Sequence, residues 1–242
     1  RRAVSAGEVE PHFQPIVDVA TLQVVGLEAF LRFKASHGDI GSVDGLIRVA
    51  EESGLMDKLG GWILREAATQ FCQLPELATG DSFFLSINLS TRQLTRNFVE
   101  TLREALDEYP ELVGRLVLEI NETAAIKRFD LVSEVLTAVR AFGVRIAIDD
   151  FGLGYSSLGT ISRLPLDQIK LDRSLVQALE SAPSSQENRQ ARALMHSAIT
   201  LASELGITII AERVESDETL ALLRDSRVNL AQGYLFSRPL PM

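Results

Sequence analysis

The sequence contains few of the residues that bind soft metal ions, with one cysteine and three histidines among 242 residues. His12, His37 and His196 lie far apart, and none has a partner at the spacing of a zinc site. Cys72 falls in an apolar helical stretch, where we expect a buried structural thiol, and a single cysteine excludes a disulfide framework. Any metal bound here must therefore have oxygen ligands.

The sequence also has no basic run, and its formal net charge is −9 at pH 7. This charge argues against binding to polymeric nucleic acid or to an anionic membrane surface. A small anionic substrate would need a cation between itself and the acidic protein.

Long hydrophobic runs are absent as well. No window approaches the roughly 18 uninterrupted apolar residues of a membrane span, and Arg1–Val4 lacks the apolar run of a secretion signal. We therefore expect a cytoplasmic domain, either free or as the cytoplasmic part of a membrane-anchored protein. Because the first residue is not Met, we expect the segment to be cut from a longer polypeptide or to have lost its own start.

The apolar content is sufficient for a large core, because 46% of the residues are hydrophobic, 24% are charged and only 8 are proline. This length accommodates one large α/β barrel or two small domains. No internal repeat, low-complexity tract or interdomain linker divides the chain. We therefore predict a single domain over residues 1–242.

Apolar, β-rich runs alternate with longer segments of helical period, a pattern typical of repeated βα units around a parallel sheet. The Asp18–Leu22 connection between the first two runs is too short for a crossover helix, so these strands should pair antiparallel. We predict a (β/α)8 TIM-like barrel with the first strand antiparallel. The predicted strands are Phe13–Val17, Gln23–Phe33, Ser82–Leu89, Arg115–Ile120, Val144–Ile148, Gln168–Leu171, Ile207–Ala211 and a weak Val228–Gln232.

The helical segments lie between these runs, and Gly143 and Gly206 follow two of them as expected C-caps. The polar stretch Leu179–Gln190 is predicted to be a mobile surface loop. The predicted helices are Val43–Glu52, Asp57–Gln73, Asn97–Tyr109, Asp130–Phe142, Arg189–Leu205 and Asp217–Asp225.

Polar residues at the C-terminal ends of the strands build the active sites of such barrels. A single strand-end Asp or Asn is usually a turn former or a helix cap. In this sequence, however, many of the apolar runs end in a polar residue or are interrupted near their ends by one. These residues are Glu28, Asn88, Glu119, Asp149, Asp150, Lys170, Glu212 and Gln232.

The five carboxylates in this set would repel one another strongly unless cations neutralised them, since desolvated like charges cost several kcal/mol. Oxygen ligands without Cys or His favour Mg²⁺ or Mn²⁺, with Ca²⁺ as a non-productive substitute. The adjacent Asp149 and Asp150 suit a bridged pair of ions roughly 4 Å apart, the arrangement that serves phosphoryl chemistry. We therefore predict bound divalent metal at the barrel mouth.

Three other motifs compete for the same segments. The segment Gly152–Gly154 follows a strand, but Ser157 replaces the third glycine of a dinucleotide fingerprint. The segment Gly154–Ser156 is not a nucleophile elbow, because Leu158 replaces the closing glycine. Lys170 could form a Schiff base, as in barrel aldolases, and this alternative stays open although the surrounding carboxylates disfavour it. Borohydride trapping of a carbonyl substrate would distinguish a Schiff-base lysine from a metal site.

A series of short segments carries a further signal. They are Phe13-Gln14-Pro15-Ile16-Val17, Glu28-Ala29-Phe30-Leu31-Arg32, Asn88-Leu89-Ser90, Leu118-Glu119-Ile120-Asn121-Glu122, Asp149-Asp150-Phe151-Gly152-Leu153-Gly154-Tyr155-Ser156-Ser157-Leu158, Lys170-Leu171-Asp172, Ala211-Glu212-Arg213-Val214-Glu215 and Gln232-Gly233-Tyr234. This ordered set, which spans nearly the whole chain, resembles the EAL-domain family of cyclic di-GMP phosphodiesterases.

The resemblance implies metal-dependent hydrolysis of cyclic di-GMP to linear pGpG, with a second, slower cleavage, in a homodimer. Two metal ions are implied as cofactors, Mg²⁺ or Mn²⁺. One ion would be held by Glu28, Asn88, Glu119 and Asp149, and the other by Asp149, Asp150 and Glu212.

The resemblance also assigns roles around the metals. Lys170 would orient or activate the attacking water, with Asp150 and Glu212 as its catalytic neighbours. Arg32 supplies a guanidinium fork suited to phosphate oxygens. The substrate-binding residues would be Gln14, Arg32, Glu215 and Gln232, and Glu122 would steady the loop after Asp150.

Three residues depart from the family's motifs. Phe30 replaces Leu and should only repack an apolar wall, whereas Leu153 replaces Thr on a loop thought to couple metal binding to dimerisation. Arg213 replaces Gly. Neighbouring strand side chains diverge, so its guanidinium should point away from the metals and towards Glu215. A sharp backbone turn would instead strain Arg213 or let it compete with a cation for Glu212.

Two other functions stay open. A cyclic di-GMP receptor without turnover would keep the pocket, but such receptors usually lack several acidic ligands, and this chain lacks none. A pure dimerisation or scaffold domain would explain neither the strand-end acids nor Lys170.

Overall fold

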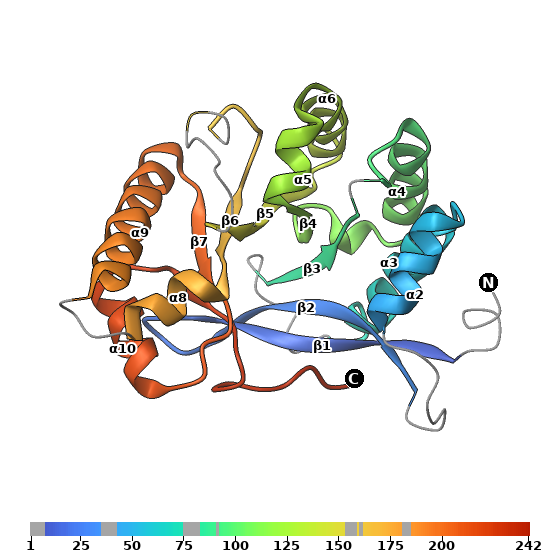
Figure 1. Cartoon of the computed structure of the whole chain (residues 1–242). Coiled ribbons are helices and arrows are strands. Elements are labelled where there is room, and N and C mark those ends of the chain that lie inside the picture. Colours follow the sequence, from blue (N-terminus) through green and yellow to red (C-terminus); the bar gives the residue numbers. More distant parts are fainter. Residues whose placement is uncertain are drawn as a thin grey trace.

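A computed structural model of the chain describes residues 8–34, 43–74, 83–90, 92–152, 159, 162–180 and 185–242. The expectations for Leu153 and for the segment 155–158 fall outside these residues. Strands β1 to β8 close into a barrel in sequence order (Figure 1). They are β1 Val9–Asp18, β2 Val24–Phe33, β3 Phe84–Asn88, β4 Leu116–Asn121, β5 Arg145–Phe151, β6 Gln168–Leu171, β7 Thr208–Ala211 and β8 Leu230–Ala231.

The first strand runs against its neighbours. β1 pairs antiparallel with β2 and also with β8, whereas the pairs from β2–β3 to β7–β8 are parallel. A tight turn makes the reversal, because Asp18 Oδ1 accepts hydrogen bonds from the N–H groups of Ala20 and Thr21. The prediction of a TIM-like barrel with an antiparallel first strand is confirmed.

Helices surround the barrel and begin at local capping signals. Side-chain oxygens of Thr95, Asn121, Ser185 and Ser216 accept N–H groups of the first turn of α4, α5, α9 and α10. Gly206 ends α9 with φ 69°, the left-handed value that favours glycine. The helices are α2 Val43–Glu52, α3 Met56–Phe71, α4 Arg96–Glu108, α5 Glu122–Lys127, α6 Phe129–Arg140, α8 Arg173–Glu180, α9 Gln186–Leu205 and α10 Asp217–Asp225, with a 3-10 turn at Pro110–Leu112.

The predicted loop Leu179–Gln190 is wrong at both ends. Helix α8 continues to Glu180, and α9 begins at Gln186 after the Ser185 cap. The first turns of α9 are polar, so the cap rather than an apolar period marks the start of this helix. Helices α5 and α8 were also missed, because they are short. Among the described helices, none has both the length and the hydropathy of a membrane span.

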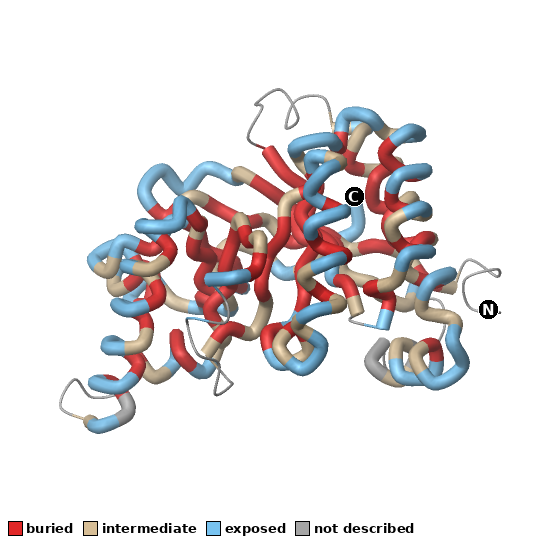
Figure 2. Tube along the Cα trace, turned by 90° about the horizontal axis from the view of Figure 1, so that it is seen from above, coloured by how far each residue is buried: buried red, intermediate tan, exposed pale blue. Residues whose placement is uncertain are grey.

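Buried residues concentrate in the strands and on the inward faces of the helices (Figure 2). Cys72 is only half-buried against this core, which corrects the expectation of a buried thiol. The interior of the barrel holds its own small apolar cluster below the site, made of Ile16, Phe84, Val117, Ala147, Ile210 and Leu230.

Candidate active site

The candidate site is the next layer of the barrel interior. Because side chains alternate along a strand, the residue two positions beyond an apolar interior residue faces the same interior. Thus Asp149 follows Ala147, whereas in the reversed β1 the order is inverted and Gln14 precedes Ile16. This layer comprises Gln14, Glu28, Ser86, Glu119, Asp149, Lys170, Glu212 and Gln232.

Lys170 lies at the centre of this layer and is fully buried. Its Nζ donates to Glu119 Oε2 at 2.6 Å and to Glu28 Oε2 at 2.8 Å. The same ammonium pairs with Glu212 Oε1 at 2.7 Å and lies 3.9 Å from Asp149 Oδ1. One cation therefore joins carboxylates from β2, β4 and β5 and from the residue that follows β7.

The protonation state of Lys170 follows from this environment. Burial alone lowers the pKa of the amine, but the charges of Glu119, Glu212 and other carboxylates raise it well above its ordinary value. The ammonium form is therefore dominant. Because a protonated amine cannot attack a carbonyl group, the Schiff-base alternative is disfavoured.

Three of the carboxylates, those of Glu119, Asp149 and Glu212, also have a raised pKa, which for an acid favours the neutral form. Burial raises the pKa of Glu119 well above its ordinary value, and the charge of Glu28 adds to this effect despite Lys170. Burial likewise raises the pKa of Asp149, and it raises the pKa of Glu212 to about 7. The site holds more negative charge than its single lysine compensates.

This excess charge tests whether a metal fits. The five predicted acidic residues and Lys170 carry a formal sum of −4 when all are ionised. Desolvated carboxylates stay ionised at neutral pH only where cations offset their charge, and otherwise they take up protons. The candidate ligand atoms are oxygens, which suits Mg²⁺ or Mn²⁺. The residues present therefore fit a hard divalent cation.

A β-bulge explains how two adjacent aspartates serve one site. The β5–β6 register shifts between Ile148 and Phe151, and Asp150 has φ 57°. In a regular strand Asp149 and Asp150 would point to opposite faces, but the bulge turns the second residue. Asn121 Nδ2 then donates to Asp150 Oδ2 at 2.7 Å. The aspartates therefore lie within β5, which continues beyond the predicted strand end at Ile148.

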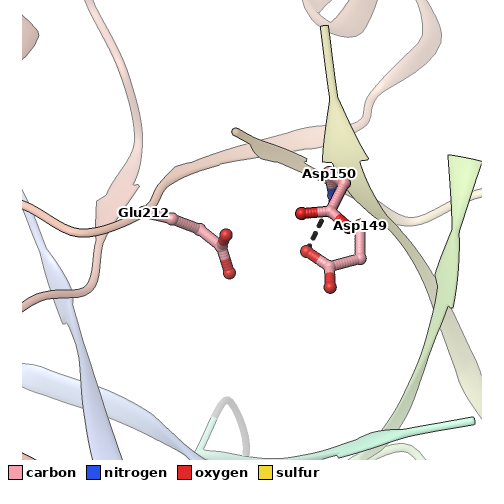
Figure 3. A group of neighbouring side chains, drawn as sticks. All are labelled: Asp149, Asp150 and Glu212. Carbon is pink, nitrogen blue, oxygen red and sulfur yellow. Dashed lines mark hydrogen bonds between the residues drawn. The ribbon is translucent and has the colours of Figure 1, made fainter. Parts of the chain in front are cut away.

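Figure 3 shows Asp149 and Asp150 beside each other, with Glu212 across from them. The N–H group of Asp150 donates to Asp149 Oδ1 at 2.9 Å. One carboxylate oxygen from each of the three residues lies within 4.8 Å of the others. This group could hold a metal ion.

The other half of the site is linked by hydrogen bonds. Asn88 Nδ2 donates to Glu28 Oε1 at 2.6 Å, and Ser86 Oγ donates to Glu119 Oε1 by a short hydrogen bond. Sequence reasoning missed Ser86. Its place two residues before Asn88 in the same strand was the available signal, because both positions share one face.

The two predicted glutamines are engaged within the protein. Gln232 Nε2 donates to Glu28 Oε2 at 2.9 Å and to Gln14 Oε1 at 3.0 Å, and Gln14 Nε2 donates to the Ser237 carbonyl. Both glutamines are buried. They connect the C-terminal segment to the first strands and hold Glu28 in place.

Arg32 and Phe30 form one wall of the site. The Arg32 guanidinium lies over the Phe30 ring, with Cζ 5.2 Å from the ring centroid, and Nη1 donates to the Leu31 carbonyl. Phe30 therefore does more than fill space, because its ring face attracts the charge of Arg32.

Glu122 lies at the start of α5 and is almost fully buried. Its Oε2 accepts the N–H group of Gly152, two residues beyond Asp150. Residues 153–158, the rest of that loop, are not described. Glu215 is exposed at the rim of the site.

A pocket of about 380 Å³ opens above the acidic layer. Glu119 and Lys170 lie below its floor, and Glu122 lies outside its lining. A larger hollow of about 710 Å³ between α3 and α4 contains none of the predicted site residues. The smaller pocket brings most of the predicted site residues together. Its lining includes Gln14, Glu28, Arg32, Asn88, Asp149, Asp150, Glu212, Glu215 and Gln232.

The family model described as EAL domain matches residues 1–239, and the chain therefore belongs to the EAL-domain family. The cyclic di-GMP phosphodiesterase NbdA of Pseudomonas aeruginosa is 36% identical over 243 residues, which cover 100% of this chain and 30% of that protein. The signaling protein YkoW of Bacillus subtilis is 29% identical, over 100% of this chain and 29% of that protein. The chain thus spans about three tenths of the length of these relatives.

Solved structures give the same family. The PaMucR phosphodiesterase in complex with c-di-GMP is similar with a TM-score of 0.88 and 31% identity, covering 100% of this chain and 95% of that one. The EAL domain of Mycobacterium smegmatis DcpA gives a TM-score of 0.76 at 31% identity, covering 97% and 92%. The FimX EAL domain of Xanthomonas citri, with a TM-score of 0.86 at 22% identity over 100% and 92%, shows the fold alone.

Proposed function

We propose that this domain hydrolyses cyclic di-GMP to linear pGpG in a reaction that requires two divalent cations. The observation that carries the proposal is the Asp149, Asp150 and Glu212 group beside the buried Lys170, under a pocket open to solvent. The similarity to NbdA and to the PaMucR complex with c-di-GMP supports the choice of substrate.

The proposed ligand sets follow the two halves of the site. Bound Mg²⁺ or Mn²⁺ would supply Lewis acidity and a hydroxide near neutral pH, and Ca²⁺ would be a non-productive substitute. Asn88 donates to Glu28 through its nitrogen, so its amide oxygen is the atom that would face a cation. One set is Glu28, Asn88, Glu119 and Asp149, and the other is Asp149, Asp150 and Glu212.

The remaining residues would position the substrate. Lys170 directs its three N–H donors at Glu28, Glu119 and Glu212, so it would orient the attacking water and offset charge on the phosphate once one of these carboxylates turns to a cation and frees a donor. Arg32 would bind phosphate oxygens, and Glu215 would contact the dinucleotide at the rim. Gln232 would act mainly by holding Glu28, to which it donates, and Gln14 by linking Gln232 to the Ser237 carbonyl.

The direct test is to incubate the purified domain with cyclic di-GMP and Mg²⁺ and to follow pGpG by chromatography. Asp149→Ala and Glu119→Ala should lose metal binding and turnover together, whereas Lys170→Ala should lose turnover but keep nucleotide binding. Asp107→Ala removes an exposed carboxylate on α4 and is the matched control. Full turnover in EDTA would contradict the metal requirement.

A cyclic di-GMP receptor without turnover is the second candidate. It is favoured by the engagement of Glu28, Glu119 and Glu212 with Lys170, since this ammonium competes with a metal ion for the same oxygens. Binding of cyclic di-GMP with equal affinity in EDTA and in Mg²⁺, without pGpG, would identify a receptor.

We also propose that the domain forms a homodimer through the segment that follows Asp150, and that it acts as one unit of a longer cytoplasmic signalling protein. The length of the relatives, of which the chain spans about three tenths, supports the second point. Light scattering tests the first, and a fully active monomer at micromolar concentration would contradict it.

A further inference from the structure

Arg213 has an unusual backbone for its residue type. Its φ is 54°, in the left-handed region that favours glycine. Strand β7 ends at Ala211, so Arg213 lies beyond the pleat, and the strand alternation that would turn it away from the site does not apply. Instead it lines the same pocket as Glu212. An arginine with this strained backbone beside the site points to a function.

The guanidinium of Arg213 has no protein partner among the residues that the structure describes. Glu212 is paired with Lys170, and no ion pair joins Arg213 to Glu215. The sequence suggested that Arg213 would contact either Glu215 or Glu212, and neither contact is present within the described residues. Arg213 is exposed and available to a ligand.

The other two arginines of the pocket are already engaged. Arg32 donates to the Leu31 carbonyl and stacks on Phe30. Arg173 Nε and Nη2 lie 2.7 Å and 2.8 Å from the Gln177 amide oxygen once that amide takes the orientation its neighbours require. Arg213 is thus the cation of this pocket without a described protein contact.

Apart from its three arginines, the charged residues that line the pocket are acids, whereas the ligand of the proposed function carries two phosphodiesters. One phosphate would be at the metal ligands. The second phosphate, on the other side of the cyclic dinucleotide, needs a separate cation, and a guanidinium fork matches its two free oxygens. Resting on the proposed function, we propose that Arg213 binds this second, non-scissile phosphate and makes the pocket selective for a ligand with two phosphates.

Arg227 provides a matched control elsewhere in the fold. It is also exposed and has φ 61°, but it lines a hollow beside α9 and the end of α10. Arg213→Gly and Arg227→Gly therefore remove the same side chain and relieve the same backbone strain. Both should raise Tm, by no more than about 4 °C.

Ligand binding separates the two variants. Calorimetry with cyclic di-GMP in Ca²⁺ should show a Kd at least tenfold higher for Arg213→Gly, and a Kd within twofold of the parent for Arg227→Gly. Arg213→Lys, which keeps the charge, should stay within about threefold to fivefold of the parent. With Mg²⁺ the loss should appear in KM rather than in kcat.

Cyclic GMP, which carries a single phosphodiester, is the control ligand. Arg213→Gly should change its Kd by less than threefold. An equal loss for cyclic GMP and cyclic di-GMP would overturn the proposal, because Arg213 would then contact a guanine or the scissile phosphate.

Two further outcomes would overturn the inference. A Kd within twofold of the parent for Arg213→Gly would show that the guanidinium does not reach the ligand. Tighter binding, or a tenfold lower Mg²⁺ requirement, would mean that Arg213 competes with cations for Glu212. A parent that neither binds nor hydrolyses cyclic di-GMP would instead refute the proposed function itself.

Discussion

Lys170 Nζ lies 2.6 Å from Glu119 Oε2 in the barrel interior, where neither side chain is exposed to solvent. The two residues come from β6 and β4, so β5 lies between them in the sheet. Each charge is tolerated there largely because the other is present, since an unpaired buried charge costs several kcal/mol. Removing one partner of this pair should therefore lower the stability of the metal-free protein.

Lys170→Met should destabilise the metal-free protein by about 3–5 kcal/mol, because it leaves several buried carboxylates without their cation. Urea denaturation in EDTA measures the loss. Mg²⁺ should restore part of the stability by replacing the missing positive charge.

The double variant Lys170→Met with Glu119→Gln is the control for this pair. It should recover at least about 1 kcal/mol relative to Lys170→Met alone, since the second change removes one unpaired acid. Additive losses would show that the two side chains are not coupled.

The pH dependence of stability should reflect Glu212. In the metal-free protein, burial and the charges of Asp149 and Glu28 raise the pKa of Glu212 from about 4.5 to about 7, although Lys170 opposes the shift. Between these values the folded state holds a proton that the unfolded chain releases. Stability should therefore fall as pH rises from 4.5 to 7, by up to about 1.4 kcal/mol per pH unit.

Denaturation in EDTA at several pH values, compared between the parent and Glu212→Gln, measures this contribution. The parent should lose more stability over this window than the variant, which cannot ionise at position 212. Parallel curves for the two proteins would rule out the raised pKa.

Phe30→Leu should weaken substrate binding by about twofold to fivefold, because it removes a cation–π contact worth about 0.5–1 kcal/mol that holds Arg32. KM measures the effect. Phe129→Leu removes the similar contact of Arg163 over Phe129, outside the pocket, and should leave KM unchanged. Equal KM values for both variants would mean that Phe30 does not position Arg32.

Gly233→Ala should destabilise the protein by about 1–3 kcal/mol and reduce activity. A Cβ at Gly233 would lie 2.0 Å from the backbone oxygen of Val214, so the two segments would have to separate. Gln232, which bonds Glu28, would move with them. In contrast, Gly61 lies within α3, where alanine favours the helix. A Cβ at Gly61 would lie 3.3 Å from the side chain of Thr101 in α4, not against backbone atoms. Thermal denaturation should therefore separate these two alanine variants.

Much of the fold could be predicted because its signals are local. Apolar strands alternating with helical segments define the barrel, and the short connection after Asp18 sets the antiparallel first pair. The failures occurred where local signals are weak. Polar residues at the start of α9 have the composition of a loop, and the Ser185 cap that begins this helix is a single residue.

The residue types of the candidate site were also visible in the sequence, because most of them occur at or near the end of a predicted strand. Their partners were not. The period of two in β3 placed Ser86 on the face of Asn88, but no local pattern indicates that Ser86 donates to Glu119. The positive φ values of Asp150 and Arg213 occur at a bulge and in the irregular segment after β7, and the sequence around them did not predict such a backbone.

By itself, therefore, the sequence determined the barrel, its reversed first strand and the set of acidic residues that makes a metal site chemically reasonable. Only the tertiary structure decided that Lys170 joins Glu28, Glu119 and Glu212, and that Arg213 lines the pocket. The reason is that Glu28 and Gln232 lie 204 positions apart and meet only when β8 closes on β1. Contacts of this kind depend on the closure and stagger of the whole barrel, which no short segment of sequence encodes.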